Sequence, residues 1–482
     1  MNDPTDWSAR SRAHVWHPCT QMHDHAGGDA APLPLIPIKS AEGVWLEGYD
    51  GKKYLDAVSS WWTNIFGHRH PHIVASLKEQ LDTLDHVIFA GFTHQPAVEL
   101  AERLCRIAPP GLSRCFFADN GSSAVEVALK MSFHYWRNAG KPGKTKYIAL
   151  TNGYHGETLG ALAVGHTGLY RDTYAPLLMQ PIHVPSPDCY DRRPGEAWED
   201  HTRRRFQDME AALEAHAHEV CAVIVEPLVQ CAGGMRMYHA VYLSLLREAC
   251  DRHGVHLIAD EIAVGFGRTG RMFACEWAPD PHPYLSAPAA AKRKPAAERE
   301  GPKNGITPDF LCLSKGLTGG TMALAVVLTR ESIYEAFYAE HGAGKAFLHS
   351  HSYTGNPIAC RAALATLDVF EEQDWPARVR LLGQLMWTRT APLRSHRHVA
   401  DVRQQGMILA IELAKNATTR EPYPAADRRG LRAYRHALEK GVLLRPLGDV
   451  VYFMPPFVIE PREIDRMVQV AIEAIDVATT DA

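Results

Sequence analysis

The sequence predicts an α/β protein, with a mostly parallel β-sheet in a larger domain and a smaller α+β domain. Three observations support this fold class. The chain of 482 residues is too long for one small core. From about residue 70, short apolar runs alternate with segments of helical apolar spacing, a pattern typical of strands covered on both faces. Some of these runs end in charged residues, as strands do at the sheet edge where α/β proteins bind ligands.

The elements follow one another in a regular order after an irregular N-terminal segment, in which the Asp50-Gly51 pair predicts a hairpin turn. We expect strands over 114–118, 146–150, 220–225, 256–259 and 310–313, and later near 407–412 and 451–454. We expect helices over 73–84, 122–136 and 241–252, and one long helical stretch from Asn356-Pro357 to about residue 390.

This order divides the chain into three parts. Residues 1–59 form an N-terminal segment that packs with the small domain, residues 60–344 form the large domain, and residues 345–482 form the small C-terminal domain. Residues 281–305 consist of Ala, Pro and charged residues with nothing to bury, so we expect a mobile surface insertion there.

The bulk properties exclude several classes of function. A net charge of −4 gives no basic surface for nucleic acid, and no apolar run approaches the roughly 18 residues of a membrane-spanning helix. The N-terminus is polar and of mixed charge, unlike a signal peptide. Ten cysteines without a Cys-x-x-Cys pair indicate reduced core residues. We therefore expect a cytoplasmic protein without nucleic-acid or membrane partners.

Two charged residues follow neighbouring apolar runs and point to one cofactor. Lys315 comes after Phe310–Ser314, and Asp260 comes after Leu257–Ala259. Desolvation at a sheet edge would lower the pKa of the lysine and make its amine nucleophilic. The lysine could then carry pyridoxal 5′-phosphate (PLP) as a Schiff base, while the aspartate holds the ring nitrogen protonated. A strand-end carboxylate and a surface lysine are the structural alternatives.

Two further segments fit such a site. Gly121 and Ser122 stand between a strand and a helix, where free amides and a hydroxyl can bind an anion, although an ordinary capped helix start explains that segment alone. Tyr154 is flanked by Gly153 and Gly156 after another strand and could stack on a flat ring. A packing role is the alternative for the tyrosine.

The run Gly265–Gly270 matches Gly-x-Gly-x-x-Gly and supplies a rival hypothesis, an NAD(P)-dependent dehydrogenase. Asp260-Glu261 stands between the strand and the glycines, where a tight turn should be, and no strand ending in an acid follows about 20 residues later. The alternating histidines at 68–72 and 349–351 could bind a metal, but no further ligand set accompanies them, so we expect no metal site.

Taken together, these segments resemble the class III aminotransferases, which are PLP enzymes of fold type I. The resemblance extends from about His14 to Pro456. Its marks are Glu226-Pro227 through Gly233-Gly234, Asp260-Glu261 with Gly265–Gly270, and Ser314-Lys315-Gly316, in the order of the family. The combination is far more specific than any one motif.

Closer motifs resemble the branch of this family that serves biotin synthesis. They are His14–Pro18, Ser59–Trp62, Gly234–Tyr238, Leu317–Met322, Leu444–Pro446 and Tyr452–Pro456. The resemblance implies transfer of an amino group to 8-amino-7-oxononanoate, giving 7,8-diaminononanoate, with S-adenosylmethionine as the expected donor. A class III aminotransferase acting on another ω-amino acid or diamine is the alternative.

The resemblance also implies a role for individual residues. Lys315, Asp260 and Tyr154 would be catalytic, with Tyr154 beside the cofactor ring and Gly121 and Ser122 at its phosphate. His351 and Ser352 would reach the phosphate from the partner subunit, which implies a homodimer with shared active sites. The substrate pocket would contain Trp61, Trp62, Cys19, Glu157, Ser350 and Arg445, with Arg445 on the substrate carboxylate.

The chain departs from the family at several of these positions. Cys19 stands where the family usually has Tyr, and Glu157 where Asp is common. Ser350 and His351 replace a Gly-Pro pair, and Ser352 replaces Thr. The cysteine bears most directly on the identity of the substrate.

Overall fold

The computed structural model describes residues 6–279 and 305–480. The predicted mobile insertion at 281–305 therefore lies outside the described residues, except for Gly305. The chain divides into two compact units, and we describe each by itself. Unit 1 comprises Met1–His70 and Leu381–Ala482, and unit 2 comprises Pro71–Arg380.

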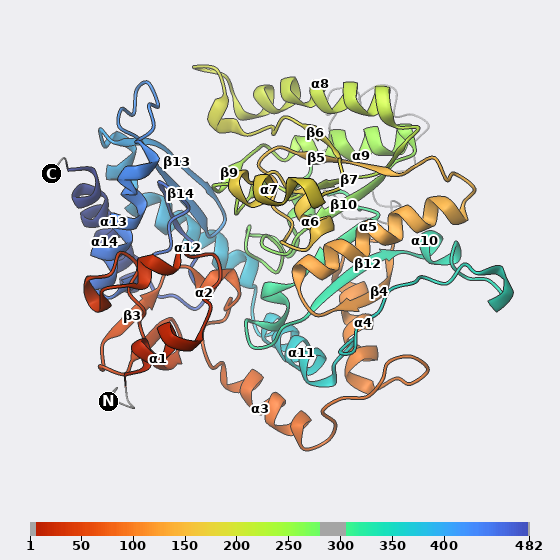
Figure 1. Cartoon of the computed structure of the whole chain (residues 1–482), viewed down its shortest axis with the longest axis horizontal. Helices are drawn as coiled ribbons and strands as arrows, with labels where there is room; N and C mark the ends of the chain where they lie inside the picture. Colours follow the sequence, from red (N-terminus) through yellow and green to blue (C-terminus); the bar gives the residue numbers. More distant parts are fainter. Residues whose placement is uncertain (1–5, 280–304, 481–482) are drawn as a thin grey trace. The chain divides into compact units, whose positions relative to one another are not determined.

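Unit 2 is built on a seven-stranded sheet with the strand order β4-β12-β11-β10-β7-β5-β6 (Figure 1). Its strands are β4 (Leu112–Ala118), β5 (Lys146–Leu150), β6 (Ile182–Val184), β7 (Val220–Val225), β10 (His256–Asp260), β11 (Phe310–Leu313) and β12 (Ala325–Arg330). The neighbours from β11 to β6 pair in parallel, whereas β12 is antiparallel to both β11 and β4. The predicted mostly parallel α/β sheet is confirmed.

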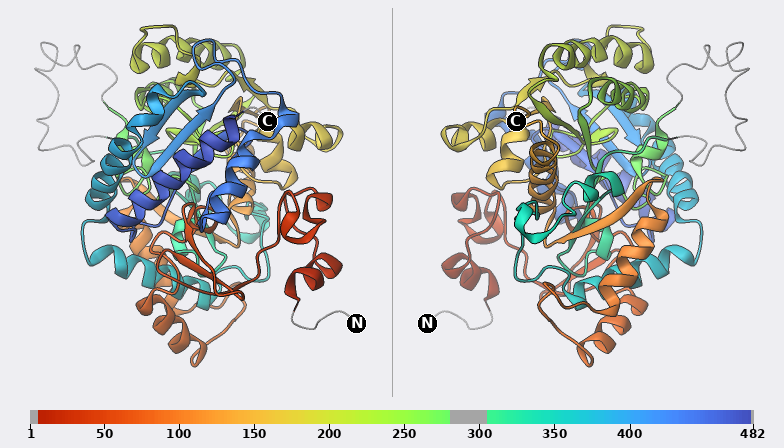
Figure 2. Two further views of the ribbon diagram at one scale, coloured as in Figure 1. Left: turned by 90° about the vertical axis from the view of Figure 1, so that its left-hand side faces the viewer. Right: turned by 90° about the vertical axis from the view of Figure 1, so that its right-hand side faces the viewer.

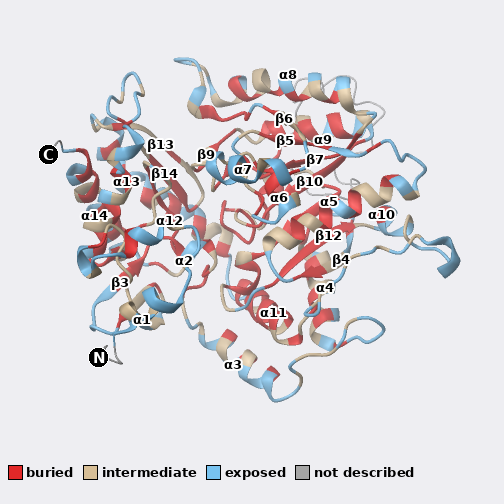
Figure 3. Ribbon diagram, in the orientation of Figure 1, coloured by how far each residue is buried: buried red, intermediate tan, exposed pale blue. Residues whose placement is uncertain are grey.

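Helices cover both faces of this sheet. Successive strand residues point to opposite faces, and every residue of β7, β10 and β11 is buried, so neither face is open at these strands (Figure 3). The helix α5 (Gly121–Asn138) packs on β4, β7, β10, β11 and β12, and α9 (Val241–His253) packs on β10 and on α8 (Trp198–His216). The shorter helices are α6 (Leu159–Val164), α7 (Gly168–Tyr174) and α10 (Glu331–Glu335).

The long helical stretch expected from 356 to 390 is two helices instead of one. They are α11 (Pro357–Glu371) and α12 (Trp375–Arg389), and Asp374 separates them by accepting a hydrogen bond from the Ala377 amide at 2.9 Å. In unit 2, α11 packs on α3 (Pro71–Leu81) and α4 (Gln95–Ile107). Residues 345–380, expected in the small domain, thus group with the larger unit, because the apolar face of α11 is buried there.

The described part of unit 1 contains a four-stranded and a three-stranded sheet, and the helices of its C-terminal part are drawn in blue in Figure 2. In the first, β1 (Ile38–Glu42), β2 (Trp45–Gly48) and β3 (Lys53–Asp56) form a meander, and β15 (Val442–Leu443) pairs in parallel with β3. In the second, β14 (Ile408–Leu413) lies between β13 (Val399–Gln405) and β16 (Val450–Phe453). The helices α13 (Arg429–Glu439) and α14 (Pro461–Thr479) pack together, and α1 (Trp7–His14) begins the described chain.

The β2–β3 connection turns at Asp50-Gly51, where Gly51 has a φ of 78° and only glycine is unstrained. The pairing of β3 with β15 joins the N-terminal segment to the C-terminal part of the chain in one sheet. No helix among the described residues is long and apolar enough to cross a membrane.

Candidate active site

Asp260 and Lys315 lie at one edge of the unit 2 sheet. The strands β10 and β11 are parallel neighbours, with Asp260 paired to Cys312, so both strands end at the same edge of the sheet. Lys315 comes two residues after Leu313, the last residue of β11, and has a φ of 44°, a left-handed backbone that is uncommon for a residue with a side chain. Burial lowers the pKa of Lys315, opposed by the charges of Asp260, Cys231 and Glu226. A lowered pKa increases the neutral fraction of the amine, which is the nucleophilic form.

Asp260 is paired with a buried histidine. Its Oδ2 lies 2.7 Å from Nδ1 of His155, and its Oδ1 accepts a hydrogen bond from the Ile262 amide at 3.1 Å. Both side chains are almost fully buried. Burial disfavours the charged form of His155, but the hydrogen bond and the charge of Asp260 outweigh it and raise the pKa of His155. Asp260 thus accepts hydrogen bonds from His155 and from the Ile262 amide in a buried place, and a carboxylate there would hold a proton on a ring nitrogen.

Sequence reasoning missed His155. It stands next to Tyr154, in the loop after β5, whereas Asp260 ends β10, two positions away in the sheet. The available signal was a histidine that follows a strand at the same sheet edge as the predicted cofactor residues.

Glu226 holds the loop that carries Tyr154. Its Oε2 accepts the Tyr154 amide at 3.0 Å, and its Oε1 accepts the Cys231 amide at 3.1 Å. Burial, with a smaller effect of Asp260, raises the pKa of Glu226 to about 7, against the charge of His155. A buried carboxyl that binds two backbone amides fixes the loop in place, and Glu226 too was absent from the predicted set of site residues.

The predicted phosphate turn is the N-terminus of α5. Asn120 caps the helix by accepting the Ser123 amide at 3.0 Å. The amides of Gly121 and Ser122 make no hydrogen bond with the described part of the chain, and such free amides at a helix start attract an anion. A side chain at Gly121 would press on Ile262 at 3.0 Å, so glycine keeps the turn close to the end of β10.

The remaining unit 2 residues lie in exposed loops. Glu157 accepts a hydrogen bond from the Tyr154 hydroxyl at 3.1 Å, which joins a predicted substrate residue to a predicted cofactor residue. Ser350 and Ser352 are exposed, and His351 is held in a turn by Thr354, whose hydroxyl donates to the His351 carbonyl at 2.7 Å.

In unit 1, the paired tryptophans lie on a left-handed backbone turn. Ser59, Ser60, Trp61 and Trp62 have φ values of 49°, 44°, 76° and 75°. Trp62 is buried, and its indole N–H donates to the Tyr452 hydroxyl at 3.1 Å, whereas Trp61 is 45% exposed. Trp61 is thus the tryptophan whose ring is open to a ligand.

Asp56 holds this turn in place. Its Oδ1 accepts the amides of Val58 at 3.2 Å and Ser60 at 3.0 Å, and its Oδ2 accepts the Ser60 hydroxyl at 2.8 Å and lies 2.9 Å from Nε2 of His68. The Ser59 hydroxyl adds a hydrogen bond to the Met454 carbonyl at 2.8 Å. Asp56 was also missed, because nothing in the sequence around it differs from an ordinary strand end.

The other predicted unit 1 residues are Cys19 and Arg445. Cys19 is exposed and has a φ of 53°. Arg445 is partly buried near Tyr434, and its charge partly offsets the burial that raises the pKa of the Tyr434 hydroxyl.

This geometry agrees with the comparison to known proteins. Residues 27–289 and 300–475 match the family model described as aminotransferase class-III. The chain belongs to the class III aminotransferases. The family resemblance inferred from the motifs is therefore confirmed.

Similar class III aminotransferases cover almost the whole chain. An adenosylmethionine-8-amino-7-oxononanoate aminotransferase from Nitratidesulfovibrio vulgaris is 43% identical over 97% of this chain and 81% of the relative. One of the same description from Helicobacter pylori is 40% identical over 99% of both chains. The crystal structure of such an enzyme from Methanocaldococcus jannaschii has a TM-score of 0.86 at 36% identity, covering 97% of this chain and 98% of that chain.

Class III aminotransferases use PLP, and PLP is the cofactor of this chain. An omega transaminase from Pseudomonas jessenii, solved in complex with PMP, has a TM-score of 0.87 at 27% identity and covers 98% of each chain. The residues present fit the group: an amine with a lowered pKa, a buried carboxylate hydrogen-bonded to a buried histidine, and two free amides at a helix start.

The dehydrogenase hypothesis is wrong for this aminotransferase. Gly265–Gly270 forms a series of turns instead of a helix start, with the Gly267 amide donating to the Met272 carbonyl at 3.1 Å. Two of the histidines weighed as metal ligands are paired with carboxylates: His68 pairs with Asp56, and His72 pairs with Asp368 at 2.8 Å. No cluster of three potential metal ligands occurs in residues 6–279 and 305–480.

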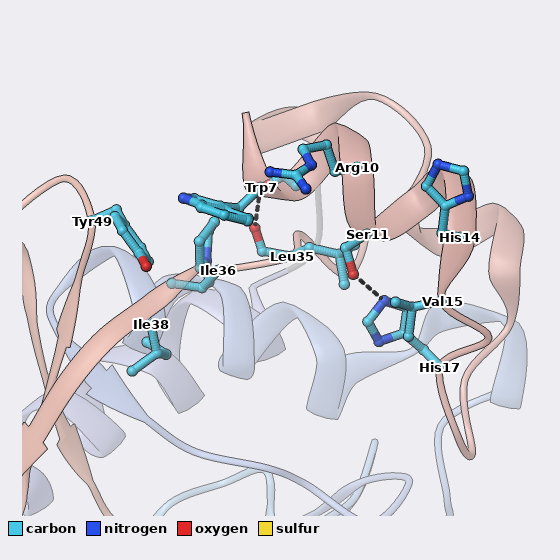
Figure 4. A pocket seen from close by; sticks show the side chains of 12 residues that line it. Trp7, Arg10, Ser11, His14, Val15, His17, Leu35, Ile36, Ile38 and Tyr49 are labelled. Carbon is cyan, nitrogen blue, oxygen red and sulfur yellow. Dashed lines mark hydrogen bonds between the residues drawn. The ribbon is translucent and has the colours of Figure 1, made fainter. Parts of the chain in front are cut away.

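Unit 1 of the aminotransferase has a groove of about 520 Å³ (Figure 4). The helix α1 forms one wall of the groove, and residues 35–38 together with Tyr49 form the other. Trp7 and Tyr49 line it with their rings 5.8 Å apart, and the Ser11 hydroxyl in its wall is 2.9 Å from Nε2 of His17. None of the predicted site residues lines this groove, so it adds nothing to the cofactor site.

Proposed function

We propose that this chain transfers an amino group from S-adenosylmethionine to 8-amino-7-oxononanoate and so forms 7,8-diaminononanoate for biotin synthesis. The observation that carries aminotransferase chemistry is the buried Asp260–His155 pair at the sheet edge that also carries Lys315. The substrate assignment is supported by full-length relatives of that description at about 40% identity.

Each residue would have one task when the cofactor is bound. PLP supplies an electron sink that makes the proton on the carbon bearing the substrate's amino group easy to remove. Lys315 would bind the cofactor and then move that proton, for which its lowered pKa suits it. Asp260 would keep a proton on the ring nitrogen, Tyr154 would stack beside the ring, and the Gly121 and Ser122 amides would bind the phosphate.

The substrates would bind in turn, the donor leaving before the acceptor binds. Trp61, and Trp62 beside it, would contact the long aliphatic chain, while the planar guanidinium of Arg445 would bind the carboxylate. Cys19, Glu157 and Ser350 would also contact the substrate.

We also propose a cytoplasmic homodimer with shared active sites. Leu348 and Tyr353, which flank Ser350–Ser352, are 75% and 64% exposed, and a subunit interface would cover these two large side chains. His351 and Ser352 would then reach the phosphate of the partner's cofactor. All ten cysteines lie among the described residues and are free, which fits a reducing compartment.

Lys315→Ala tests the chemistry. We expect the variant to lose turnover and the visible absorbance of lysine-bound PLP, whereas Lys78→Ala on the exposed side of α3 keeps both. Retained turnover in Lys315→Ala would make the assignment wrong. Equilibrium sedimentation of the two variants tests whether the chain forms a dimer.

Substrate identity needs a separate measurement. Arg445→Ala should lower kcat/KM for 8-amino-7-oxononanoate about 10- to 100-fold, the usual effect of losing a hydrogen-bonded charge pair. The alternative is another ω-amino acid or diamine as substrate; the paired tryptophans and Arg445 disfavour it, while Cys19 leaves room for it. An assay that compares S-adenosylmethionine with ω-amino acids and diamines as amino donors to 8-amino-7-oxononanoate decides between the two.

A further inference from the structure

One face of α5 carries a row of polar side chains that contacts two loops of unit 2. Its members stand four residues apart and so lie on one side of the helix: Ser122, Glu126, Lys130, His134 and Asn138. Lys130 donates to the Leu348 carbonyl at 3.0 Å, and Asn138 donates to the Lys345 carbonyl at 3.2 Å, so the far end of the row holds segment 345–349. The near end, Ser122 and Glu126, holds the turn around Glu157.

Glu126 caps the helix that follows this turn. A single carboxylate oxygen, Oε1, accepts the Thr158 hydroxyl at 2.6 Å, the Gly160 amide at 2.7 Å and the Ala161 amide at 3.1 Å. Thr158 occupies the N-cap position of α6 but does not cap the helix with its own side chain. A carboxylate from α5 therefore takes the place of the usual cap, where it also interacts favourably with the helix dipole.

The hydroxyl groups of Ser122 and Thr158 form a chain of hydrogen bonds in which each hydroxyl donates toward Glu126. The Glu126 carboxylate oxygen accepts, so the Thr158 hydroxyl donates its hydrogen bond to Glu126. Thr158 must then accept from the Ser122 hydroxyl at 2.8 Å, while Ser122 accepts the Thr158 amide at 3.0 Å. Ser122, which belongs to the predicted phosphate turn, is thus bonded twice to the residue after Glu157.

Two glycines place the turn directly against α5. At Gly156, with a φ of 124°, an added side chain would collide with Ser122, and at Gly160 it would collide with the Glu126 carboxylate. The residues between these glycines include Glu157, which also accepts the Tyr154 hydroxyl. The segment that carries Glu157 is therefore fixed to α5 at both of its ends.

We propose that Glu126 is a positioning residue of the active site, which holds Glu157 at a set distance from the phosphate turn through Thr158 and the first amides of α6. The inference rests on the proposed function, because Glu126 would position Glu157, a residue that binds the substrate of that reaction. Glu126 touches neither substrate nor cofactor in this role. Its effect is on substrate binding and leaves the chemistry at Lys315 unchanged.

Steady-state kinetics of the PLP-loaded enzyme test this role. Glu126→Ala should raise the KM of both substrates about 3- to 10-fold, since each loses the contribution of a well-placed hydrogen bond, while kcat stays within about twofold of wild type. Glu126→Gln keeps an oxygen at the same place and should restore most of the loss. Glu102→Ala, at an exposed glutamate of α4, is the matched control and should behave as wild type.

Amide hydrogen exchange gives a second readout that does not depend on the substrate. The Gly160 and Ala161 amides should exchange at least about tenfold faster in Glu126→Ala than in wild type or Glu126→Gln. Thr158→Val, which removes only the hydroxyl, should show a smaller increase and serves if the alanine variant does not fold. Unchanged KM, a fall in kcat alone, or unchanged exchange at these amides would overturn the inference. Absence of transamination by the wild type would instead overturn the proposed function, and exchange would still decide the role of Glu126 in holding the turn.

Discussion

Two aspartate–histidine pairs, one in each unit, have different roles although the side chains are of the same kind. In unit 2, Asp260 lies 2.7 Å from His155, and in unit 1, Asp56 lies 2.9 Å from His68. Both aspartates are buried. The difference lies in what else each carboxylate binds, and this difference indicates which of the two can take part in a reaction.

Asp56 uses its carboxylate on its own neighbourhood. It accepts two backbone amides and a serine hydroxyl in addition to His68. Asp260 accepts one backbone amide besides His155, which leaves acceptor capacity for a protonated ring nitrogen. A fully occupied carboxylate stabilises a backbone conformation, whereas one with spare capacity can bind a cofactor.

The backbone beside each pair also differs. Lys315 is a single left-handed residue, but Ser59–Trp62 form four in succession. Each such residue costs about 1–2 kcal/mol when it carries a side chain. The hydrogen bonds of Asp56 must offset this strain, so the unit 1 pair stabilises a strained backbone segment and the unit 2 pair does not.

The largest effect is expected for Asp260→Asn. The variant keeps the size of the side chain but loses the charge that would hold the ring nitrogen protonated, and we expect kcat to fall about 100- to 1,000-fold. Single-turnover kinetics with the loaded enzyme measure this loss. If Asp56→Asn lowered kcat as much, the distinction between the pairs would be lost.

His155→Gln should have the next largest effect. Asp260 keeps the Ile262 amide but loses the hydrogen bond from His155; a hydrogen bond to a carboxylate contributes about 1.5–3 kcal/mol, so kcat/KM should fall about 10- to 100-fold. His68→Gln is the matched change in unit 1 and should affect stability more than activity. Equal losses of activity in the two variants would contradict the assignment of His155 to the cofactor site.

These contrasts show where the sequence was informative. Lys315 and Asp260 could be predicted because apolar strands end in charges at one sheet edge, a local pattern with a physical cause. His155 acts through a partner 105 residues away, which only strand order brings close. The left-handed turn could not be predicted, because Ser-Ser-Trp-Trp contains no glycine, and its stabilising hydrogen bonds come from Asp56 and from the distant Met454 carbonyl, which the local pattern does not reveal.

Asp56→Asn should mainly destabilise the protein. Asparagine keeps one oxygen for the two amides but loses the charge beside His68 and an acceptor for Ser60, so the free energy of unfolding should fall by about 1.5–3 kcal/mol. Urea denaturation measures the change. The control is Asp476→Asn, which alters a pair with His396 whose aspartate is 61% exposed, and a surface pair contributes little. A fall as large in the control would show that burial of Asp56 is not the cause.

The pH dependence of stability should separate the pairs further. The pKa of His155 is raised above its usual 6.5, so the folded state binds its proton more tightly than the unfolded state. The stabilisation is complete below pH 6.5 and is lost as the pH rises through the raised pKa. The gap in melting temperature between wild type and His155→Gln should therefore be larger at pH 6 than at pH 9. A gap that is constant or grows with pH would contradict this.

The smallest effect tests the strain itself, through two changes at Ser60. Both Ser60→Ala and Ser60→Gly remove the hydroxyl that donates to Asp56, so they differ only in the side-chain carbon. Glycine in a regular helix is less stable than alanine by about 0.5–1 kcal/mol, whereas a left-handed position penalises alanine by about 1–2 kcal/mol. At a φ of 44°, Ser60→Gly should therefore unfold at higher urea concentration than Ser60→Ala. At Lys78 in α3, a right-handed helix, the order should be reversed. The same order at both positions would mean that the turn carrying Trp61 stores no strain, and Asp56 would then have nothing to offset.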